Sequence, residues 1–236
     1  ELQRQSQGSS TTSADEDTNS SISAAIAADE ERDRVRAAEH RQRRARDEGA
    51  YCLGGYRAAD EFRAERFTTS AATAAAFAAA QAFDAAKDNL YLCGPTGSGK
   101  SHLAAVAARR SFQRHGNDWP ERVRTHTPMQ LSRMMRACAD ASEEMRFINS
   151  LVSREVLVID DLGVQKDTEF LVSVLYEVFN DRYQNSAGGL IVTSNLTLGD
   201  FARKVGDDRI ASRLSQMCAV FNIAGEPDHR PPARKT

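Results

Sequence analysis

Gly94-Pro95-Thr96-Gly97-Ser98-Gly99-Lys100-Ser101 is the stretch of this sequence that decides the fold. It matches the pattern G-x-x-x-x-G-K-[ST], in which glycines let the backbone wrap around an anion, so that backbone N–H groups and the start of the following helix point at phosphates. Lys100 is expected to reach the β- and γ-phosphates of a nucleotide, and Ser101 to hold magnesium. The alternative is a glycine-rich turn that binds nothing.

The segments on either side of this loop favour the phosphate-binding interpretation. Residues 89–93 form an apolar run that is typical of a buried strand, and residues 101–115 have the composition of a helix. A strand, a glycine-rich loop and a helix in this order are the structural context that the motif requires. We therefore predict that residues 94–101 bind ATP together with Mg2+.

Length, charge and cysteine content narrow the class of protein. The chain has 236 residues, enough for one sizeable domain with a tail, and a formal net charge of -2, which gives no reason to expect nucleic-acid binding from total charge. Its four cysteines are far apart, which disfavours a zinc ribbon and a secreted disulfide framework and favours reduced thiols. No stretch is long and apolar enough for a membrane span or a signal core, so a cytoplasmic location is expected.

Composition divides the chain into four parts. Residues 1–28 are rich in Ser, Thr and acids and should be disordered, because they offer too little apolar surface to offset the entropy of ordering. Residues 29–50 mix arginines with acids and are interpreted as a charged helical arm, which is either simply solvated or docks on a partner protein or a phosphate backbone. Residues 51–230 are predicted to form the nucleotide-binding domain, and residues 231–236 a short tail.

A second decisive stretch is Val156-Leu157-Val158-Ile159-Asp160-Asp161-Leu162-Gly163. Four apolar residues followed by paired acids predict a buried strand that delivers carboxylates at its C-terminal end, where ligands of parallel sheets bind. Asp160 is expected to anchor magnesium through water, and Asp161 to polarise the attacking water. Alternatively, Asp161 only caps the next element.

The remaining periodicity predicts further helices around these motifs. A helix over residues 70–86 should contain Phe83, and an amphipathic helix over residues 168–183 should have Phe170 and Tyr183 among its apolar positions. These helices are expected to cover the sheet.

The stretch between the two motifs is expected to hold a strand over residues 122–127 and two helices over residues 128–140 and 142–153. The helical part has a local basic character, which comes from Arg133, Arg136 and Arg146. These arginines either face solvent or line a nucleic-acid channel.

Another buried strand, over residues 190–194, places Asn195 at its tip. Because ligands gather where parallel strands end, the Asn195 amide is predicted to orient the lytic water against the γ-phosphate. The alternative is that Asn195 simply ends the strand in a turn.

Arg209 and Arg213 lie four residues apart, on one face of a predicted final helix that is followed by a strand over residues 219–223. If the chain acts alone, they are surface cations of little consequence. If copies form a ring or spiral, one of them can reach a neighbour's γ-phosphate as an arginine finger, since a planar guanidinium matches phosphate geometry.

Taken together, these motifs resemble those of one family, the AAA+ ATPases of the bacterial helicase-loader type (DnaC-like) and the closely similar IstB transposition helpers. The resemblance covers residues 51–230. It rests on four segments in family order, residues 99–104, 159–163, 193–196 and 208–214. It implies an α/β P-loop NTPase fold of the AAA+ ASCE type, with a parallel five-stranded sheet flanked by helices. Only six residues follow Arg230, so no C-terminal lid domain is expected.

The same resemblance implies roles for single residues. Asp161 takes the place of the family's usual glutamate, Asn195 is the sensor-one residue, and Arg213 is the arginine finger with Arg209 beside it. His102 follows the phosphate loop within the family motif, and Arg230 resembles an arginine that senses nucleotide. Both are therefore counted among the candidate nucleotide contacts.

The resemblance also implies partners. The leading expectation is an ATPase that assembles on single-stranded DNA as a homo-oligomeric ring or spiral and loads a replicative helicase. An IstB-like ATPase helper of a DNA transposase is the alternative within the same class. A nucleotide-dependent adaptor that hydrolyses ATP negligibly is an alternative from a different class.

Overall fold

The computed structural model describes most of the predicted nucleotide-binding domain. The described residues are 35, 63–115, 123–163, 169–185 and 188–224. The chain divides into two units, residues 1–44 and 45–236, and every strand and helix named below belongs to the second. The predicted tails lie outside the described residues, as do Arg230 and all of the predicted charged arm except Val35.

The domain is built on a parallel sheet of five strands in the order β2-β3-β4-β1-β5. The strands are β1 (Leu90–Cys93), β2 (Val123–His126), β3 (Val156–Leu162), β4 (Gly189–Ser194) and β5 (Ala219–Asn222). Strands β1, β3 and β4 are buried along almost their whole length, because a parallel sheet is covered on both faces. The predicted five-stranded parallel sheet is confirmed.

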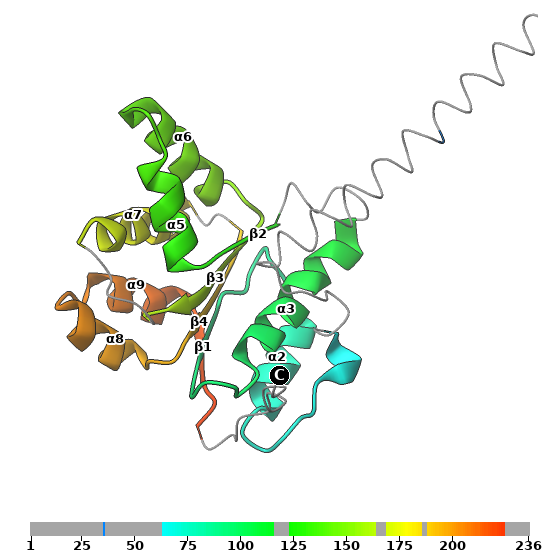
Figure 1. The fold of residues 1–236 in the computed structure, drawn as a ribbon. Coiled ribbons are helices and arrows are strands. Elements are labelled where there is room, and N and C mark those ends of the chain that lie inside the picture. Colours follow the sequence, from blue (N-terminus) through cyan, green and yellow to red (C-terminus); the bar gives the residue numbers. More distant parts are fainter. Residues whose placement is uncertain (1–34, 36–62, 116–122, 164–168, 186–187, 225–236) are drawn as a thin grey trace, which may run out of the picture. The chain divides into compact units, whose positions relative to one another are not determined.

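Helices cover both faces of this sheet (Figure 1). The 3-10 turn η1 (Ala64–Arg66) leads to α2 (Ala74–Ala82), which lies with α3 (Lys100–His115) on one face. The other face carries α5 (Pro128–Arg136), α6 (Ala141–Val152), α7 (Glu169–Asn185), α8 (Leu198–Val205) and α9 (Arg209–Met217). Among the helices of the described residues, none combines the length and the apolar composition needed to cross a membrane.

Strand β3 contributes to both hydrophobic cores of the domain. Leu157 and Ile159 pack in the core under α5–α9, whereas Val156 and Val158 pack in the core under α2 and α3. The alternation follows from the period of two in a β-strand. As a result, the strand is held firmly between two apolar layers up to Asp160.

Side-chain caps set where three helices begin. Thr127 and Gln130 form a capping box at the start of α5, each side chain accepting a hydrogen bond from the other's backbone N–H at 3.2 and 2.9 Å. Asp140, predicted inside a helix over residues 128–140, instead caps α6 by accepting a bond from the backbone of Glu143. Thr197 caps α8 in the same way.

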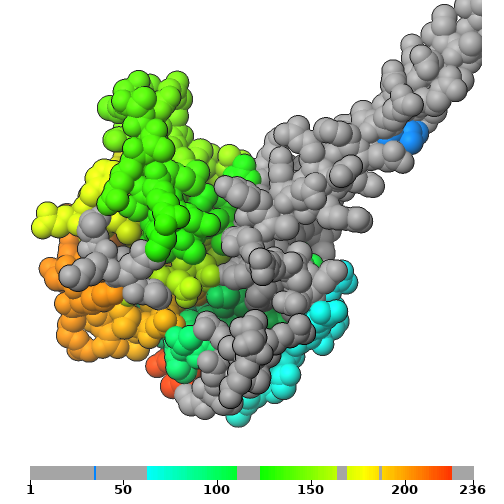
Figure 2. All heavy atoms as spheres, viewed as in Figure 1, coloured from blue at the N-terminus to red at the C-terminus, as the bar shows by residue number. Residues whose placement is uncertain are grey.

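The α5–α6 pair stands out from the surface of the domain (green in Figure 2). Its three arginines, Arg133, Arg136 and Arg146, are all exposed. Arg146 also lies 3.9 Å from the Glu143 carboxylate. The exposure of these arginines agrees with the interpretation that they face solvent. That they line a nucleic-acid channel stays a prediction.

Two helix predictions differ from the structure. The helix predicted over residues 70–86 is shorter, because Ser70 and Thr73 bond each other's backbone N–H with their hydroxyls at its start, and Phe83 leaves the helical conformation at its end with φ -49 and ψ 127. Helix α8 is absent from the sequence predictions, although its ends carry standard signals, the Thr197 cap and Gly206 in the left-handed conformation.

Helix α7 also sits differently from the predicted amphipathic helix. Phe170 and Tyr183 are each 40% exposed, whereas Arg182 is 1% exposed. The Arg182 guanidinium donates four hydrogen bonds of 2.8–3.0 Å to backbone carbonyls, two of them at the end of α6, one at Arg154 just beyond it and the fourth at Gly189. The carbonyls left over at the end of a helix therefore decide how α7 is rotated.

The three described cysteines, Cys93, Cys138 and Cys218, are free thiols, and two of them are buried. Burial raises the pKa of Cys218 to about 12, so this thiol stays protonated at neutral pH. This agrees with the prediction of reduced, partly buried cysteines.

Candidate nucleotide-binding site

The phosphate loop connects β1 directly to α3. Two of its glycines are required by the geometry. A Cβ on Gly94 would lie 2.7 Å from the backbone oxygen of Ile223, which is too close for any side chain. Gly99 has φ +89, and a Cβ there would lie 2.8 Å from the ring of Phe67. Together they let the chain turn sharply and expose the N-terminus of α3, which is where a helix binds anions.

Two side chains of the loop point into it and suit an anionic ligand. Lys100 is 5% exposed, and its Nζ donates hydrogen bonds to the carbonyls of Gly94 and Pro95 at 3.0 and 2.7 Å. Ser98 is 1% exposed, and among the described residues its Oγ has no hydrogen-bond partner. A buried hydroxyl in this position is costly unless a ligand satisfies it. The loop residues therefore fit a bound triphosphate.

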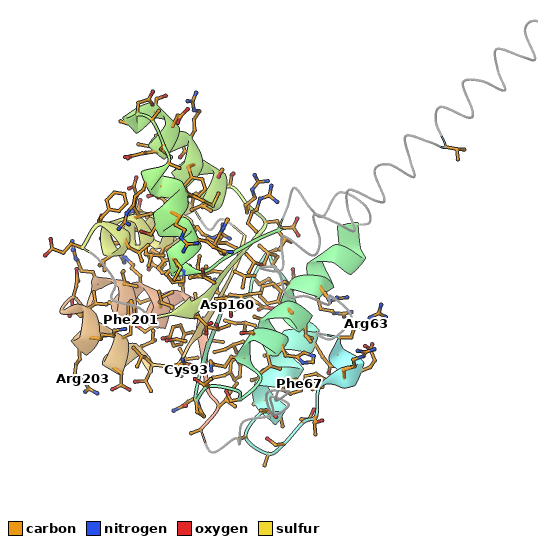
Figure 3. All side chains as sticks on the ribbon, viewed as in Figure 1. Arg63, Phe67, Cys93, Asp160, Phe201 and Arg203 are labelled. Carbon is orange, nitrogen blue, oxygen red and sulfur yellow. The ribbon has the colours of Figure 1, made fainter. Side chains whose placement is uncertain are left out.

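Asp160 lies near the C-terminal end of β3 (labelled in Figure 3), and two hydroxyl groups from other elements bond it. Thr193 of β4 donates to Asp160 Oδ1 at 2.6 Å, and Ser101 of α3 donates to the same oxygen at 2.9 Å. Ser101 and Asp160 are far apart in the sequence, and the pairing of β3 with β4 brings Thr193 to them. The structure thus joins the phosphate loop to the acidic strand, as the sequence predicts.

Burial changes the protonation of Asp160. Only 5% of this residue is exposed, and burial raises the pKa of Asp160 to about 6, with the neighbouring Asp161 charge adding to the rise and the Thr193 hydrogen bond opposing it. A cation bound nearby would favour the ionised form. Burial and the neighbouring Asp161 charge thus disfavour the ionised form of Asp160, and a bound cation would oppose them.

The donor set at this point fits Mg2+. The Ser101 hydroxyl and the Asp160 carboxylate are hard oxygen ligands, and they lie next to the loop that would hold phosphates. Within the described part of the chain, no group of three or more His, Cys, Asp and Glu side chains could hold a metal by itself. This suits magnesium, which commonly binds through one or two protein ligands and completes its shell with phosphate oxygens and water.

Asp161 has an unusual backbone conformation. Its φ of 62 makes it the one non-glycine residue with positive φ among those that the structure describes. The register of β3 against β4 shifts between Ile159 and Leu162, and the Asp161 N–H donates to the Thr193 hydroxyl at 2.9 Å. The residue is exposed, unlike its neighbours in the strand. Such strained backbone clusters at functional sites, where the surrounding structure holds it.

Asn195 follows β4 directly and is exposed. The turn that carries it is tied to the neighbouring strands: Ser194 Oγ donates to the Leu162 carbonyl at 2.7 Å, and the Tyr91 hydroxyl donates to the Leu196 carbonyl at 2.9 Å. The residues on both sides of Asn195 are therefore tied to neighbouring strands, Ser194 to β3 and Leu196 to β1. These links hold the amide near the end of the strand that bears Asp160 and Asp161.

Arg209 and Arg213 project from α9, on the face of the sheet opposite α3. Arg209 is bound by Asp207, with contacts of 2.6–3.1 Å from its Nη2 and Nε. Arg213 donates to the side-chain oxygen of Gln216 at 3.3 Å. The two arginines thus share a helix but have different partners.

His102 makes contacts outside the phosphate loop. Its Nε2 lies 2.8 Å from the carbonyl oxygen of Arg63, and its ring meets Phe67 edge-on at 5.1 Å. Phe67 in turn stacks on Phe77, with ring centroids 5.1 Å apart (Phe67 is labelled in Figure 3). Burial lowers the pKa of His102. A nucleotide contact by His102 remains a prediction.

The site also contains a residue that the sequence analysis does not assign. Thr193 is fully buried and bonds both Asp160 and the backbone of Asp161. In the sequence it begins segment 193–196, on which the family resemblance partly rests, but no role is given to it there. Its position opposite the acids depends on strand register, so no local pattern shows that it contacts them.

The strand order, the phosphate loop and the paired acids define a P-loop nucleotide-binding protein with the AAA+ fold. More particularly, the chain belongs to the family described as IstB-like ATP binding protein, whose sequence model matches residues 7–231. The predicted family resemblance is thereby confirmed. The match extends over residues on both sides of the described domain.

Curated relatives agree with this family. The ATP-binding protein of insertion sequence IS5376 from Geobacillus stearothermophilus is 28% identical over 146 residues, which are 59% of this chain and 55% of that protein. The ATP-binding protein of insertion sequence IS21 from Pseudomonas aeruginosa is 29% identical over 152 residues, 61% of this chain and 54% of that protein. The chain therefore spans about half the length of the curated relatives that it matches.

Solved structures share the fold. The crystal structure of the DnaC helicase loader aligns with a TM-score of 0.57 and 18% identity, covering 70% of this chain and 97% of that chain. AMPPCP-bound DnaA from Aquifex aeolicus aligns with a TM-score of 0.58 and 19% identity, covering 69% of this chain and 50% of that one. At these identities the likeness is one of fold.

Proposed function

We propose that this protein hydrolyses ATP, and that Asp161 activates the attacking water. The observation that carries the proposal is the backbone of Asp161, held at φ 62 with its carboxylate exposed beside the buried Asp160. The two acids have separate environments, since Asp160 bonds Ser101 and Thr193 while Asp161 extends to solvent. A buried carboxylate suits metal binding, and an exposed one suits proton transfer with water.

The other site residues have supporting roles in this proposal. Lys100 and the N-terminus of α3 would bind the phosphates, and Ser101 with Asp160 would hold Mg2+, which neutralises triphosphate charge. Asn195 would orient the water that Asp161 activates. These roles rest on the contacts described above and on the position of Asn195 at the end of β4.

We further propose that copies of this chain assemble so that Arg213 completes a neighbour's site. Arg213 lies on the opposite face of the sheet from α3, which begins in the chain's own phosphate loop. Arg209 is the weaker candidate, because its guanidinium already forms an ion pair with Asp207 at 2.6 Å. A guanidinium supplied in trans stabilises the charge that develops on the transferred phosphoryl group.

We propose that this protein acts in DNA transposition, with a transposase as its partner. Copies of the chain would assemble on single-stranded or duplex DNA. The support is the family and the relatives, two of which are ATP-binding proteins of insertion sequences. Helicase loading, the leading expectation from the sequence, is the alternative, and it is supported at the level of fold by DnaC.

The enzymatic part is tested with an Asp161→Asn variant. Asparagine has the same shape and also tolerates positive φ, so the free energy of unfolding should change by less than about 0.5 kcal/mol. Turnover of ATP, measured with and without DNA, should fall by on the order of a hundredfold or more while ATP binding is retained. If the wild-type protein shows no ATP turnover that is lost in Asp161→Asn, the result supports the adaptor alternative instead.

The shared site is tested by mixing two inactive variants. Lys100→Ala removes a charge that neutralises phosphate. Arg213→Ala removes the guanidinium, and loss of an arginine finger lowers kcat on the order of a thousandfold. Each variant keeps one intact half-site, so a mixture should regain part of the activity. Absence of any gain on mixing would place the action of Arg213 outside a shared site.

The partner is tested by affinity capture with the full chain in the presence of ATP and magnesium. Capture of a transposase supports the proposed setting. Capture of a hexameric replicative helicase supports the loader. DNA binding is measured separately, by fluorescence anisotropy of a labelled single strand and of a duplex.

A further inference from the structure

Two arginines of α9 lie over tyrosine rings of α7. The guanidinium carbon of Arg209 lies 4.9 Å from the ring centroid of Tyr176, and that of Arg213 lies 4.8 Å from the ring centroid of Tyr183. Both distances are within the range of a cation–π interaction. The same pairing thus occurs twice, once for each candidate finger.

The charge partners of the two arginines differ. Arg209 forms three hydrogen bonds with the carboxylate of Asp207, and these bonds lower the pKa of Asp207. Arg213 bonds the neutral amide of Gln216, and no carboxylate of the described residues lies within ion-pair distance of it. Arg209 is therefore engaged within its own chain, whereas the charge of Arg213 is uncompensated by the residues around it.

Tyr183 makes little contribution to the core that would otherwise explain its position. It is 40% exposed and lies near the end of α7. The contact with the Tyr183 ring is a cation–π contact and not a hydrogen bond, so it restricts the motion of the guanidinium without occupying its N–H donors. Arg213 is thereby held in place, and apart from the Nη1 donor that bonds Gln216, its N–H groups stay available to an oxyanion.

We propose that Tyr183 is a positioning residue, which holds the Arg213 guanidinium ready to bind the terminal phosphate of ATP on a neighbouring copy of this chain. This inference rests on the proposed ATPase function and on the shared site. In the same arrangement, Tyr176 holds Arg209 together with Asp207 as a structural unit. Tyr183 and Tyr176 are therefore a matched pair, one serving the reaction and the other serving the fold.

The experiment compares steady-state ATP hydrolysis by the full chain carrying Tyr183→Leu, Tyr183→Phe or Tyr176→Leu. Tyr183→Leu removes the ring and should lower kcat about two- to fivefold, the factor that a cation–π contact is worth at an exposed site. KM should be unchanged, because this chain's own nucleotide site is intact, and the free energy of unfolding should fall by no more than the lost contact is worth. Tyr183→Phe keeps a ring and should restore kcat, and Tyr176→Leu should leave kcat at the wild-type value.

A second ring-free variant, Tyr183→Gln, guards against a folding defect that is specific to leucine, and it should show the same loss. The proposal is overturned if Tyr183→Leu and Tyr183→Gln keep wild-type kcat while Arg213→Ala is inactive, or if Tyr183→Phe fails to restore kcat. It is also overturned if Tyr176→Leu lowers kcat equally. If Arg213→Ala itself keeps wild-type kcat, the shared site proposed above has failed, and that result is distinct from a failure of Tyr183 alone.

Discussion

Thr193 offers the sharpest test of how the acidic pair is held. Its hydroxyl donates to Asp160 at 2.6 Å and accepts from the Asp161 N–H at 2.9 Å, and the residue is fully buried. Thr193→Val replaces the hydroxyl with a methyl group of similar volume. The substitution therefore removes both hydrogen bonds and leaves the packing of β4 nearly unchanged.

The expected loss of stability follows from the two bonds. A hydrogen bond to a charged group contributes about 1.5–3 kcal/mol, and leaving a buried donor unsatisfied costs about 1–3 kcal/mol. Part of this loss is recovered if water replaces the missing donor at Asp160, which keeps its bond from Ser101. We therefore expect Thr193→Val to lower the free energy of unfolding by about 2–4 kcal/mol at neutral pH.

The assay is urea unfolding followed by far-UV circular dichroism, with magnesium and nucleotide absent. Thr193→Ser is the matched control, because it keeps the hydroxyl and loses one buried methyl group, about 1 kcal/mol. The slope of the free energy against urea should be the same for all three proteins, so that the midpoints report stability alone. The increase in ATP affinity that magnesium causes should also be smaller in Thr193→Val, because Asp160 loses the hydrogen bond from Thr193 that orients it.

A valine variant as stable as the serine variant would refute this reasoning. That result would mean that the hydroxyl does not organise Asp160 and Asp161. A serine variant less stable than the valine variant would instead locate the importance of Thr193 in its methyl group.

Three further outcomes are expected. Burial lowers the pKa of His126 from 6.5 to about 4, so at about pH 5 the unfolded chain binds a proton at this residue that the folded chain excludes. The free energy of unfolding should therefore fall as the pH is lowered from 7 to 5, by about 2 kcal/mol more in the wild type than in His126→Gln. Urea unfolding at each pH measures this difference. Arg182→Met removes four hydrogen bonds to backbone carbonyls and should cost about 3–5 kcal/mol or prevent folding, whereas a loss below about 1 kcal/mol would contradict the role given to Arg182. Gly99→Ala should lower the free energy of unfolding by about 1–3 kcal/mol, through its positive φ and the contact of the new Cβ with Phe67. Thermal unfolding should show a smaller loss of stability when the same change is made in Phe67→Ala, and equal losses would show that the ring contact is unimportant.

Much of the candidate site follows from local sequence. The phosphate loop is recognisable because glycine, lysine and serine must occur at set spacings for backbone N–H groups and a helix start to surround phosphate. The acidic strand is recognisable because an apolar run that ends in carboxylates is typical of a central parallel strand. Both motifs lie where predicted, in β1–α3 and at the end of β3, and Ser101 and Asp160 are 2.9 Å apart.

Helix boundaries could be predicted only in part. The Thr197 cap and Gly206 mark α8 in the sequence, yet a short helix of mixed composition gives a weak periodic signal. The start and end of α2 depend on local hydroxyl bonds at Ser70 and Thr73 and on the burial of Phe83, which compete with helix propensity.

By itself, the sequence determined the class of site, because its two motifs are contiguous and their chemistry is local. Tertiary structure decided how the motifs are completed. Thr193 reaches Asp160 and Asp161 only through the register of β4 against β3, and Tyr183 reaches Arg213 only through the rotation of α7 against α9. Strand register and helix rotation are set by the packing of residues that are distant in the chain, here the two cores and the buried Arg182, and a local pattern carries no information about them.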